Sequence, residues 1–394
     1  MATFTRRAKR LARVVREARM FARAMQSPRH PILAQVVVTR RCNLACTYCN
    51  EFDRVSLPVP TADLLRRVDR LADLGTSIIT LTGGESLLHP KLDTVIARIR
   101  ERGAMAVLLT NGFLLNRERI RRLNRVGLDY LQLSIDNIEP DAVSKKSLSL
   151  LERRLAELAA CAEFQVTINS VVGAGANDPE DAHTIALRAR ALGFTSTVGV
   201  VHDGAGQLRP LGARHRDVVD RILRLAPSLF SFAQLGHFQE NVIRGLPNRW
   251  HCRAGGRFLY ICEDGLVHYC SQQRGRPGIP LETYSAADLA READFPKPCA
   301  PFCTLSCVHQ VAMLDSFRER PAGALAAMMD ERKKGDPGFK VPMLVTLLSR
   351  TFLDQRRRTL TARVALRMLS VKRQANHADA PRALPAGGRR EDYS

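Results

Sequence analysis

Between residues 32 and 201, short apolar runs alternate with longer amphipathic segments. The short runs are rich in β-branched residues and end in Gly, Ser, Asn or Asp, which is typical of buried strands. The longer segments repeat apolar residues at three- and four-residue spacing, which is typical of helices. The predicted strands are 33–39, 77–82, 104–109, 129–135, 164–171 and 195–201. The predicted helices are 61–74, 90–102, 116–126, 145–161 and 180–192. This alternation predicts an α/β fold with a parallel sheet and helices outside it.

Three cysteines follow directly on the first predicted strand. Cys42, Cys46 and Cys49 lie in the stretch VVVTRRCNLACTYCN, separated by three and then two residues. Three thiolates cannot complete a tetrahedral four-ligand site, but they can hold three irons of a 4Fe–4S cluster. The fourth iron is then open to a chelating small molecule. A zinc site or unrelated thiols are the alternative, but the order of strand, cysteine loop, helix and GGE rarely arises by chance.

The cysteine loop resembles the CxxxCxΦC signature of the radical SAM superfamily, with Tyr48 in the aromatic position. In that family the open iron binds S-adenosylmethionine, and one-electron reduction splits it to methionine and a 5′-deoxyadenosyl radical. The resemblance implies a partial (β/α)6 TIM-like barrel, short of the eight units that close a full barrel. It also implies a flavodoxin- or ferredoxin-type electron donor.

Polar residues end the next strands, at the edge where parallel α/β folds bind ligands. The second strand runs into Gly83-Gly84-Glu85. The glycines let the backbone pass close to a ligand, and the carboxylate can accept a hydrogen bond from an ammonium group. By resemblance, this motif grips the methionine amino group of S-adenosylmethionine. Each of the remaining polar residues could alone be a turn or cap residue, but the resemblance places them around the same cofactor: Asn111, Ser134, Asp136 and Asn169.

The sixth predicted strand ends in His202 and Asp203. A His-Asp pair at a barrel mouth can orient a substrate or move a proton, so both residues are catalytic candidates on the substrate side. A helix-capping role for Asp203 is the alternative.

A second group of cysteines lies between residues 252 and 307. Cys252, Gly265 and Cys270 resemble the opening of SPASM/twitch domains, which add iron–sulfur clusters to radical SAM enzymes, and Glu263-Asp264-Gly265 predicts a hairpin between them. The later cysteines of this region do not follow the pattern of that family, so we expect one auxiliary 4Fe–4S cluster. Its ligands are Cys252 and Cys270 plus two of three later cysteines, the last two being favoured; a structural zinc site is the alternative. The later cysteines are Cys299, Cys303 and Cys307.

The formal charge of +21 is concentrated near the ends of the chain. Residues 1–30 and 340–373 each carry nine Lys or Arg against one acid, so together they hold 16 of the 21 excess charges. The body is close to balanced, and nucleic acid is not an expected partner. The N-terminal segment predicts a basic amphipathic helix, which either lies on an anionic membrane surface or docks its apolar stripe on the body. Its Arg-rich, acid-poor character also resembles a mitochondrial transit peptide.

These features predict six segments along the chain. They are a basic helix 1–30, the barrel 31–204, a helical linker 205–250, the auxiliary-cluster region 251–335, a second basic amphipathic helix 336–373 and a disordered tail 374–394. No apolar run is long enough to span a bilayer, and the cysteine spacing suits metal ligation in a reducing compartment. We therefore expect a cytoplasmic protein, peripheral on the inner face of the membrane if the basic ends bind lipid.

The substrate stays open at the level of sequence. The basic amphipathic ends favour a membrane lipid or polyprenoid, and a weaker resemblance to radical SAM enzymes that adenosylate hopanoid precursors agrees with this. Many SPASM/twitch enzymes instead mature ribosomally made peptides, but only about thirty residues precede the barrel, so leader binding is expected to need a separate partner. Sugars and other small metabolites are the third class.

Overall fold

The computed structural model describes residues 2–173, 178–201, 211–225, 241–320 and 323. The chain divides into two units, Met1–Lys340 and Val341–Ser394, and every described residue belongs to the first. Three features predicted above lie outside the described residues: the basic segment 336–373, the tail 374–394, and the pair His202 and Asp203.

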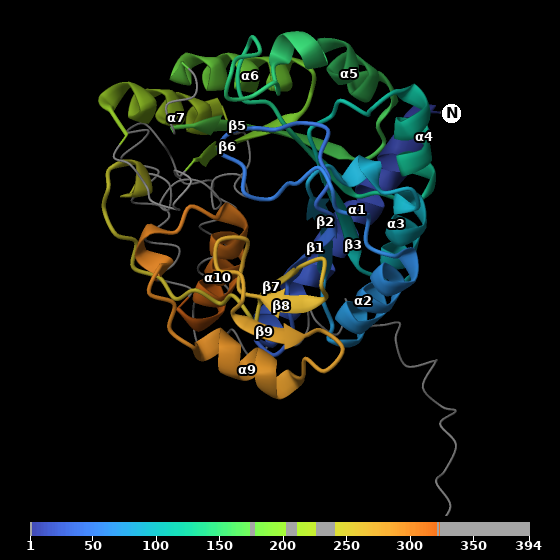
Figure 1. Cartoon of the computed structure of the whole chain (residues 1–394), viewed down its shortest axis with the longest axis vertical. Helices are drawn as coiled ribbons and strands as arrows, with labels where there is room; N and C mark the ends of the chain where they lie inside the picture. Colours follow the sequence, from blue (N-terminus) through green and yellow to red (C-terminus); the bar gives the residue numbers. More distant parts are fainter. Residues whose placement is uncertain (1, 174–177, 202–210, 226–240, 321–322, 324–394) are drawn as a thin grey trace, which may run out of the picture. The chain divides into compact units, whose positions relative to one another are not determined.

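Six parallel strands and the helices around them follow the predicted alternation. The strands are β1 (Leu33–Thr39), β2 (Ile78–Gly83), β3 (Met105–Thr110), β4 (Tyr130–Ser134), β5 (Gln165–Val172) and β6 (Thr195–Val200). The helices are α2 (Thr61–Asp73), α3 (Leu92–Glu101), α4 (Arg117–Arg125), α5 (Leu148–Cys161), α6 (Pro179–Ala191) and α7 (Ala213–Leu225). The strands pair in chain order, and Figure 1 shows these helices on the outer side of the curved sheet. The predicted α/β partial barrel is confirmed.

The cysteine-rich region extends the same sheet. β7 (Phe258–Ile261) pairs in parallel with β1 on the side away from β2. β8 (Leu266–His268) and β9 (Pro277–Pro280) continue in antiparallel order, so the sheet formed by the described residues has nine strands. Gly265, with a φ of +82°, lies in the turn between β7 and β8, where the hairpin was predicted. The region continues with α9 (Ala286–Asp294), a 3-10 turn at Ala300–Phe302 and α10 (Ser306–Glu319).

Alternate residues of β1 face two different cores, because successive side chains of a strand point to opposite faces. Val36 and Val38 pack in the cluster that contains the buried residues of α2 and α3. Val37 packs in a second cluster with Phe258 of β7 and Val308 of α10. The inner side of β1 is therefore covered by the cysteine-rich region, which the pairing of β7 also ties to the barrel through backbone hydrogen bonds.

A buried ion cluster joins this region to the N-terminal segment. Arg257, which is fully buried, donates to Asp315 of α10 over 3.1 Å and to the backbone oxygens of Ala24 and His30. Arg318 donates to the same carboxylate over 2.5 Å. Burial lowers the pKa of Arg257, while Asp315 acts in the opposite direction and favours the charged form. The carboxylate of Asp315 therefore compensates buried positive charge.

Replacing Asp315 with alanine is expected to lower the free energy of unfolding by about 3–5 kcal/mol, since it leaves the Arg257 guanidinium buried without its counterion. Asp73→Ala is the matched control, because Asp73 pairs with Arg102 at the surface with 57% of its side chain exposed. Exposed pairs of this kind contribute about 0–1 kcal/mol. Chemical denaturation of both variants measures the difference, and equal losses would contradict a structural role for the buried cluster.

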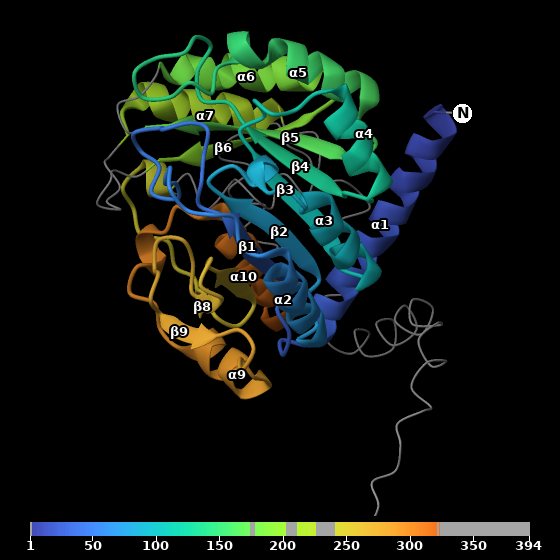
Figure 2. The ribbon, with the colours of Figure 1, turned by 45° about the vertical axis from the view of Figure 1, so that its right-hand side comes forward.

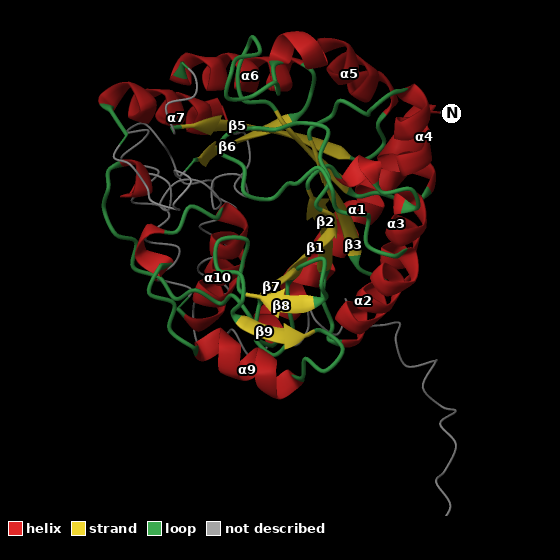
Figure 3. Cartoon of the chain, in the orientation of Figure 1, coloured by secondary structure: helices red, strands yellow, loops and turns green. Residues whose placement is uncertain are grey.

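Helix α1 (Ala2–Gln26) lies at the N-terminal ends of β4 and β5. Arg16 pairs with Asp129, which directly precedes β4, and Lys9 pairs with Glu163, which shortly precedes β5. Figure 2 shows α1 on the right of the sheet and the loop that follows β1 on the left. Figure 3 distinguishes helices, in red, from loops, in green. The helix thus docks on the body, but not through the predicted apolar stripe. Its N-terminal half is held by charged residues that pair with the buried Asp129 and the half-buried Glu163, and Met20 and Ala24 pack in the second core cluster. No helix among the described residues is both long and apolar enough to cross a bilayer.

Candidate active site

The three cysteines of the first motif lie on the loop after β1. The sulfur of Cys46 is buried, and those of Cys42 and Cys49 belong to half-buried residues. Burial raises the pKa of Cys42 and of Cys49, and in both cases the neighbouring cysteines of the loop raise it further. The three sulfurs are therefore close enough to repel one another as thiolates. All ten cysteines lie in the described part of the chain, and each is a free thiol. This donor set fits three irons of a cubane cluster, which would relieve the repulsion.

Gly83 and Gly84 let the end of β2 pass against the backbone that leads into the cysteine loop. Gly84 N donates to Thr39 O over 2.8 Å, and Glu85 N donates to Arg41 O over 2.9 Å. A Cβ added at Gly84 would lie 2.3 Å from Arg40 O. We expected these glycines to leave room for a ligand. In the structure the space beside them is occupied by the backbone of residues 39–41, at and after the end of β1. The GGE motif therefore fixes where the cysteine loop begins.

Glu85 joins the ends of β2 and β3. Its side chain is fully buried and accepts hydrogen bonds from Thr110 Oγ1 and from Asn111 N, each over 2.7 Å. It also caps the short 3-10 turn Ser86–Leu88 by accepting from Leu87 N. Burial raises the pKa of Glu85, against the effect of these three donors. The carboxylate is thus held in one position at the C-terminal edge of the sheet.

Asn111 connects this carboxylate to the cysteine loop. Its Nδ2 donates to Asn43 Oδ1 over 2.8 Å and lies 3.8 Å from the sulfur of Cys42. The charge of Glu85 raises the pKa of Cys42, so the two groups lie within electrostatic range. Cys42, Glu85 and Asn111, predicted separately from three strand ends, therefore belong to one site.

A second set of contacts surrounds Asp136, just past the end of β4. Its Oδ2 accepts hydrogen bonds from Tyr48 OH and from Ser144 Oγ, the latter over 2.7 Å, and lies 3.0 Å from Lys146 Nζ. Ser144 Oγ is also 3.5 Å from the sulfur of Cys46. Tyr48 of the cysteine loop and Asp136 after β4 are therefore joined by a hydrogen bond.

Lys146 is a site residue that the sequence analysis missed. Its side chain is 13% exposed, and its Nζ donates to Tyr48 OH. Burial alone would lower the pKa of Lys146, but Asp136, Tyr48 and Cys46 raise it above its usual value, so the ammonium stays charged. It also lowers the pKa of Cys49, against the larger effect of burial. Nothing in the local sequence distinguishes Lys146 from the exposed Lys145 beside it.

The remaining strand-end residues are neighbours in the sheet. Ser134, the last residue of β4, is the register partner of Asn169, which lies inside β5 and not at its end as predicted. Asn169 Oδ1 accepts a hydrogen bond from Thr197 Oγ1 over 2.9 Å. These residues lie at the same edge of the sheet as Asp136, and their roles toward S-adenosylmethionine stay predictions.

The second group of cysteines also comes together. Cys252 and Cys270 are buried in the core cluster that lies on the inner side of β1. Burial raises the pKa of Cys270 to about 12, and the charges of Cys252 and Cys299 add to the rise. Burial also raises the pKa of Cys303, and Cys270, Cys252 and Cys299 raise it further. Burial raises the pKa of Cys307 to about 12, and the charge of Cys252 raises it further. Gln35 Nε2 of β1 donates to the sulfur of Cys307 over 3.7 Å. Five thiols therefore lie in one neighbourhood, and Cys299 belongs to it alongside the favoured Cys303 and Cys307.

Cys262 is buried in the same core cluster as Cys252 and Cys270, and Arg40 Nη2 lies 3.5 Å from its sulfur. Possible ligand atoms of Cys262, Asp264 and His268 lie within 4.8 Å of one another. However, Gly275 N donates to His268 Nδ1 over 2.9 Å, so the neutral ring carries its proton on Nε2, the atom that faces Asp264. The positive charge of Arg40 and the Nε2 proton of His268 both disfavour the binding of a cation between Cys262, Asp264 and His268.

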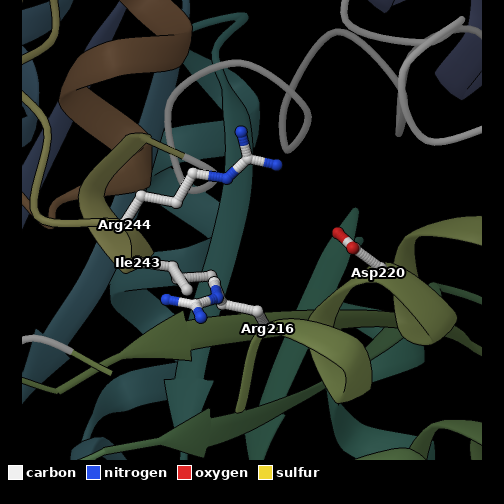
Figure 4. A pocket seen from close by; sticks show the side chains of 4 residues that line it. All are labelled: Arg216, Asp220, Ile243 and Arg244. Atoms are coloured by element: carbon white, nitrogen blue, oxygen red, sulfur yellow. The ribbon is translucent and has the colours of Figure 1, made fainter. Parts of the chain in front are cut away.

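The structure also has a small pocket on the α7 side of the barrel (Figure 4). Arg216, Asp220, Ile243 and Arg244 line an open space of about 190 Å³, and the figure shows the polar side chains around the opening. Burial raises the pKa of Asp220, while Arg224 and Arg244 oppose that rise. None of the predicted site residues that the structure describes lines this pocket.

Comparison with known proteins gives one family match. Residues 36–188 match the model of the radical SAM superfamily. The Fe-coproporphyrin III synthase of Methanosarcina barkeri is 37% identical over 107 residues, which is 26% of each chain. The PqqA peptide cyclase of Granulibacter bethesdensis is 29% identical over 167 residues, 41% of this chain and 44% of the relative. The chain thus spans less than half the length of these curated relatives.

A solved structure, Streptococcus suis SuiB bound to its precursor peptide SuiA, is similar to this chain with a TM-score of 0.47. The two share 15% sequence identity over 61% of this chain and 60% of that one.

Proposed function

Because residues 36–188 of this chain belong to the radical SAM superfamily, we propose that it is an iron–sulfur enzyme that modifies an organic substrate by radical chemistry. Cys42, Cys46 and Cys49 hold a 4Fe–4S cluster, and Glu85, with Gly83 and Gly84, receives the amino group of S-adenosylmethionine. When bound and supplied with an electron by a flavodoxin- or ferredoxin-type donor, these cofactors would provide a 5′-deoxyadenosyl radical, with methionine as the other product, for hydrogen abstraction from the substrate or addition to it. The observation that carries the proposal is the link from Cys42 through Asn111 to the buried Glu85.

The chain's own residues hold this site together. Glu85 is oriented by two donors at the end of β3 and by one in the 3-10 turn Ser86–Leu88, so its carboxylate is held in one position. Asp136 holds Tyr48 through its phenol oxygen, which fixes the aromatic ring next to Cys49. Ser134 and Asn169 offer polar groups to the ribose and adenosine. His202 and Asp203 remain substrate-side candidates.

The second group of cysteines supports one auxiliary 4Fe–4S cluster. Cys252 and Cys270 supply two ligands, and two of Cys299, Cys303 and Cys307 supply the others. Such a cluster can accept or relay an electron, or bind the substrate. Four thiolates also suit zinc, so iron and sulfide counts separate the two.

Anaerobic reconstitution with iron and sulfide, followed by an assay for 5′-deoxyadenosine, tests the function. The expected result is about eight irons per chain for two clusters, and release of methionine and 5′-deoxyadenosine under reducing conditions. A reduced protein with a full iron content that leaves S-adenosylmethionine intact would overturn the proposal.

For the substrate, we propose a membrane lipid or polyprenoid, which the basic amphipathic N-terminal helix supports. A peptide is the second candidate, since a PqqA peptide cyclase is among the relatives. Adding lipid, peptide and polar-metabolite fractions of a cell extract to the same assay distinguishes them. The fraction that increases 5′-deoxyadenosine formation and itself changes mass contains the substrate.

Replacing Lys146 with methionine is expected to shift the reduction potential of the Cys42/Cys46/Cys49 cluster to more negative values. A positive charge near the sulfurs favours the added electron, so its loss disfavours reduction. An EPR-monitored redox titration measures the shift. Lys145→Met is the matched control, because Lys145 is exposed. Identical potentials in the two variants would show that Lys146 only supports the fold.

A further inference from the structure

The side of α1 that faces the body carries charged residues along its N-terminal half, whereas Met20 and Ala24, nearer its C-terminal end, pack in the core cluster that contains Phe258 and Val308. Lys9 donates to Asn124 O over 2.8 Å and pairs with Glu163. Arg13 is 8% exposed and lies 5.5 Å from the ring centre of Tyr130. Arg16 pairs with Asp129, whose side chain is 1% exposed, and Glu17 accepts from Tyr130 OH. The acidic residue of the helix is thus turned toward the barrel.

The outer side of the same helix is apolar. Leu11 is 67% exposed, Val14 is 50% exposed and Val15 is 38% exposed. Ala8 and Ala18 are exposed on the same side. At 100° per residue, these side chains form one stripe along the helix, opposite Lys9, Arg13 and Arg16. This stripe, called here the outer stripe, consists of Ala8, Leu11, Val14, Val15 and Ala18.

Such an arrangement is the reverse of an ordinary surface helix, which buries its apolar stripe and exposes its charges. A contiguous exposed apolar surface marks an interaction site. The rim of the outer stripe indicates the partner. Arg10 lies on one flank and Arg19 on the other, with Arg7 at the N-terminal end of the stripe, and all three are exposed. An apolar centre between arginines fits a surface that is both anionic and apolar beneath.

We propose that the outer stripe inserts into the interface of an anionic membrane, with Arg10 and Arg19 against lipid phosphates. A helix lying in the interface plane buries its apolar face at the boundary of headgroups and acyl chains, and arginines beside it pair with the headgroups. The inner side needs no rearrangement for this, because its ion pairs with the barrel leave the outer stripe outward.

The position of α1 also sets the orientation of the proposed active site. The helix lies at the N-terminal ends of β4 and β5, whereas the cysteine loop follows the C-terminal end of β1 in this parallel sheet (Figure 2). Strands of this length separate the two by about 20 Å. The site therefore faces away from the bilayer, and a lipid substrate has to leave the membrane to reach it. This orientation rests on the proposed function; the docking surface does not.

Vesicle flotation of the full-length, reconstituted protein tests the docking surface. We expect binding to phosphatidylcholine vesicles that contain phosphatidylglycerol, and much weaker binding to phosphatidylcholine alone. The double variant L11S/V14S is expected to lose more than about tenfold in partitioning onto the anionic vesicles, and R10Q/R19Q a similar factor. L150S/L187S is the matched control, because Leu150 and Leu187 are 44% and 45% exposed on α5 and α6.

Substitutions are preferable to deletion of residues 1–30, since deletion would also remove the ion pairs of the inner side. Equal partitioning of L11S/V14S and the wild type, or absence of wild-type binding to anionic vesicles, would overturn the proposal. So would a wild-type dimer in solution that L11S/V14S converts to a monomer, because a second copy would then cover the outer stripe. 5′-Deoxyadenosine formation without vesicles is expected to be equal in all variants, which separates this test from that of the radical chemistry.

Discussion

Replacing Cys42, Cys46 and Cys49 with alanine is expected to abolish 5′-deoxyadenosine formation and to lower the iron content by about four atoms per chain. The reason is that these three thiols lie on one loop, repel one another as thiolates and are not joined in disulfides. No other cysteine lies on this loop. Iron and sulfide analysis after anaerobic reconstitution, with product quantified by chromatography, measures both effects.

The control for this experiment is Cys161→Ala. Cys161 is the last residue of α5 and packs against the barrel core. It is distant in sequence from both groups of cysteines. Its replacement is expected to leave iron content and product formation unchanged. A triple variant that keeps its full iron content would mean that the cluster is held elsewhere, and the proposed site would be wrong. The separate double variant Cys252→Ala with Cys270→Ala is expected to lose the irons of the auxiliary cluster, about four per chain.

Replacing Gly84 with alanine is expected to displace the cysteine loop and to prevent stable cluster binding. The added Cβ would lie 2.3 Å from Arg40 O and 2.4 Å from Arg41 O, and both atoms are backbone that cannot rotate away. Relief requires breaking the hydrogen bonds from Gly84 N to Thr39 O and from Glu85 N to Arg41 O. We expect a loss of about 1–3 kcal/mol in the free energy of unfolding from overpacking, and a larger fractional loss of iron.

Gly199→Ala in β6 is the matched control for that substitution. Its nearest neighbour would be Val171 Cγ1 at 3.7 Å, an ordinary contact. Thermal unfolding together with iron content distinguishes the two variants. If G84A bound iron as well as G199A does, the close packing of β2 against the cysteine loop would not govern the site.

The barrel and its motifs were predictable because they depend on local pattern. Apolar runs of strand length and helical spacing predicted β1 to β6 and α2 to α6 to within a few residues. The cysteine spacing depends only on neighbours in sequence, and it led to the family that the comparison with known proteins then matched. The Glu263-Asp264-Gly265 turn likewise carries its own conformational preference, so the hairpin of β7 and β8 was foreseeable.

Contacts between distant segments were not predictable in this way. The parallel pairing of β7 with β1 depends on how a late segment packs against the barrel, and the two strands are more than two hundred residues apart. Lys146 became a site residue only because the loop after β4 brings it to Asp136 and Tyr48. One of two adjacent lysines in a polar loop has no local signal for such a role.

The N-terminal helix shows most clearly the difference between what the sequence determines and what the tertiary structure determines. The sequence by itself determined that α1 is a helix with an apolar stripe and a basic remainder, since both follow from spacing along one segment. Only the tertiary structure decided which side faces the barrel. Asp129 is a buried acid and Glu163 a half-buried one, both on distant segments. Their ion pairs with Arg16 and Lys9 turn the charged side inward and leave Leu11 and Val14 outward. Periodicity defines the faces of a helix, but the charges of its neighbours select between them.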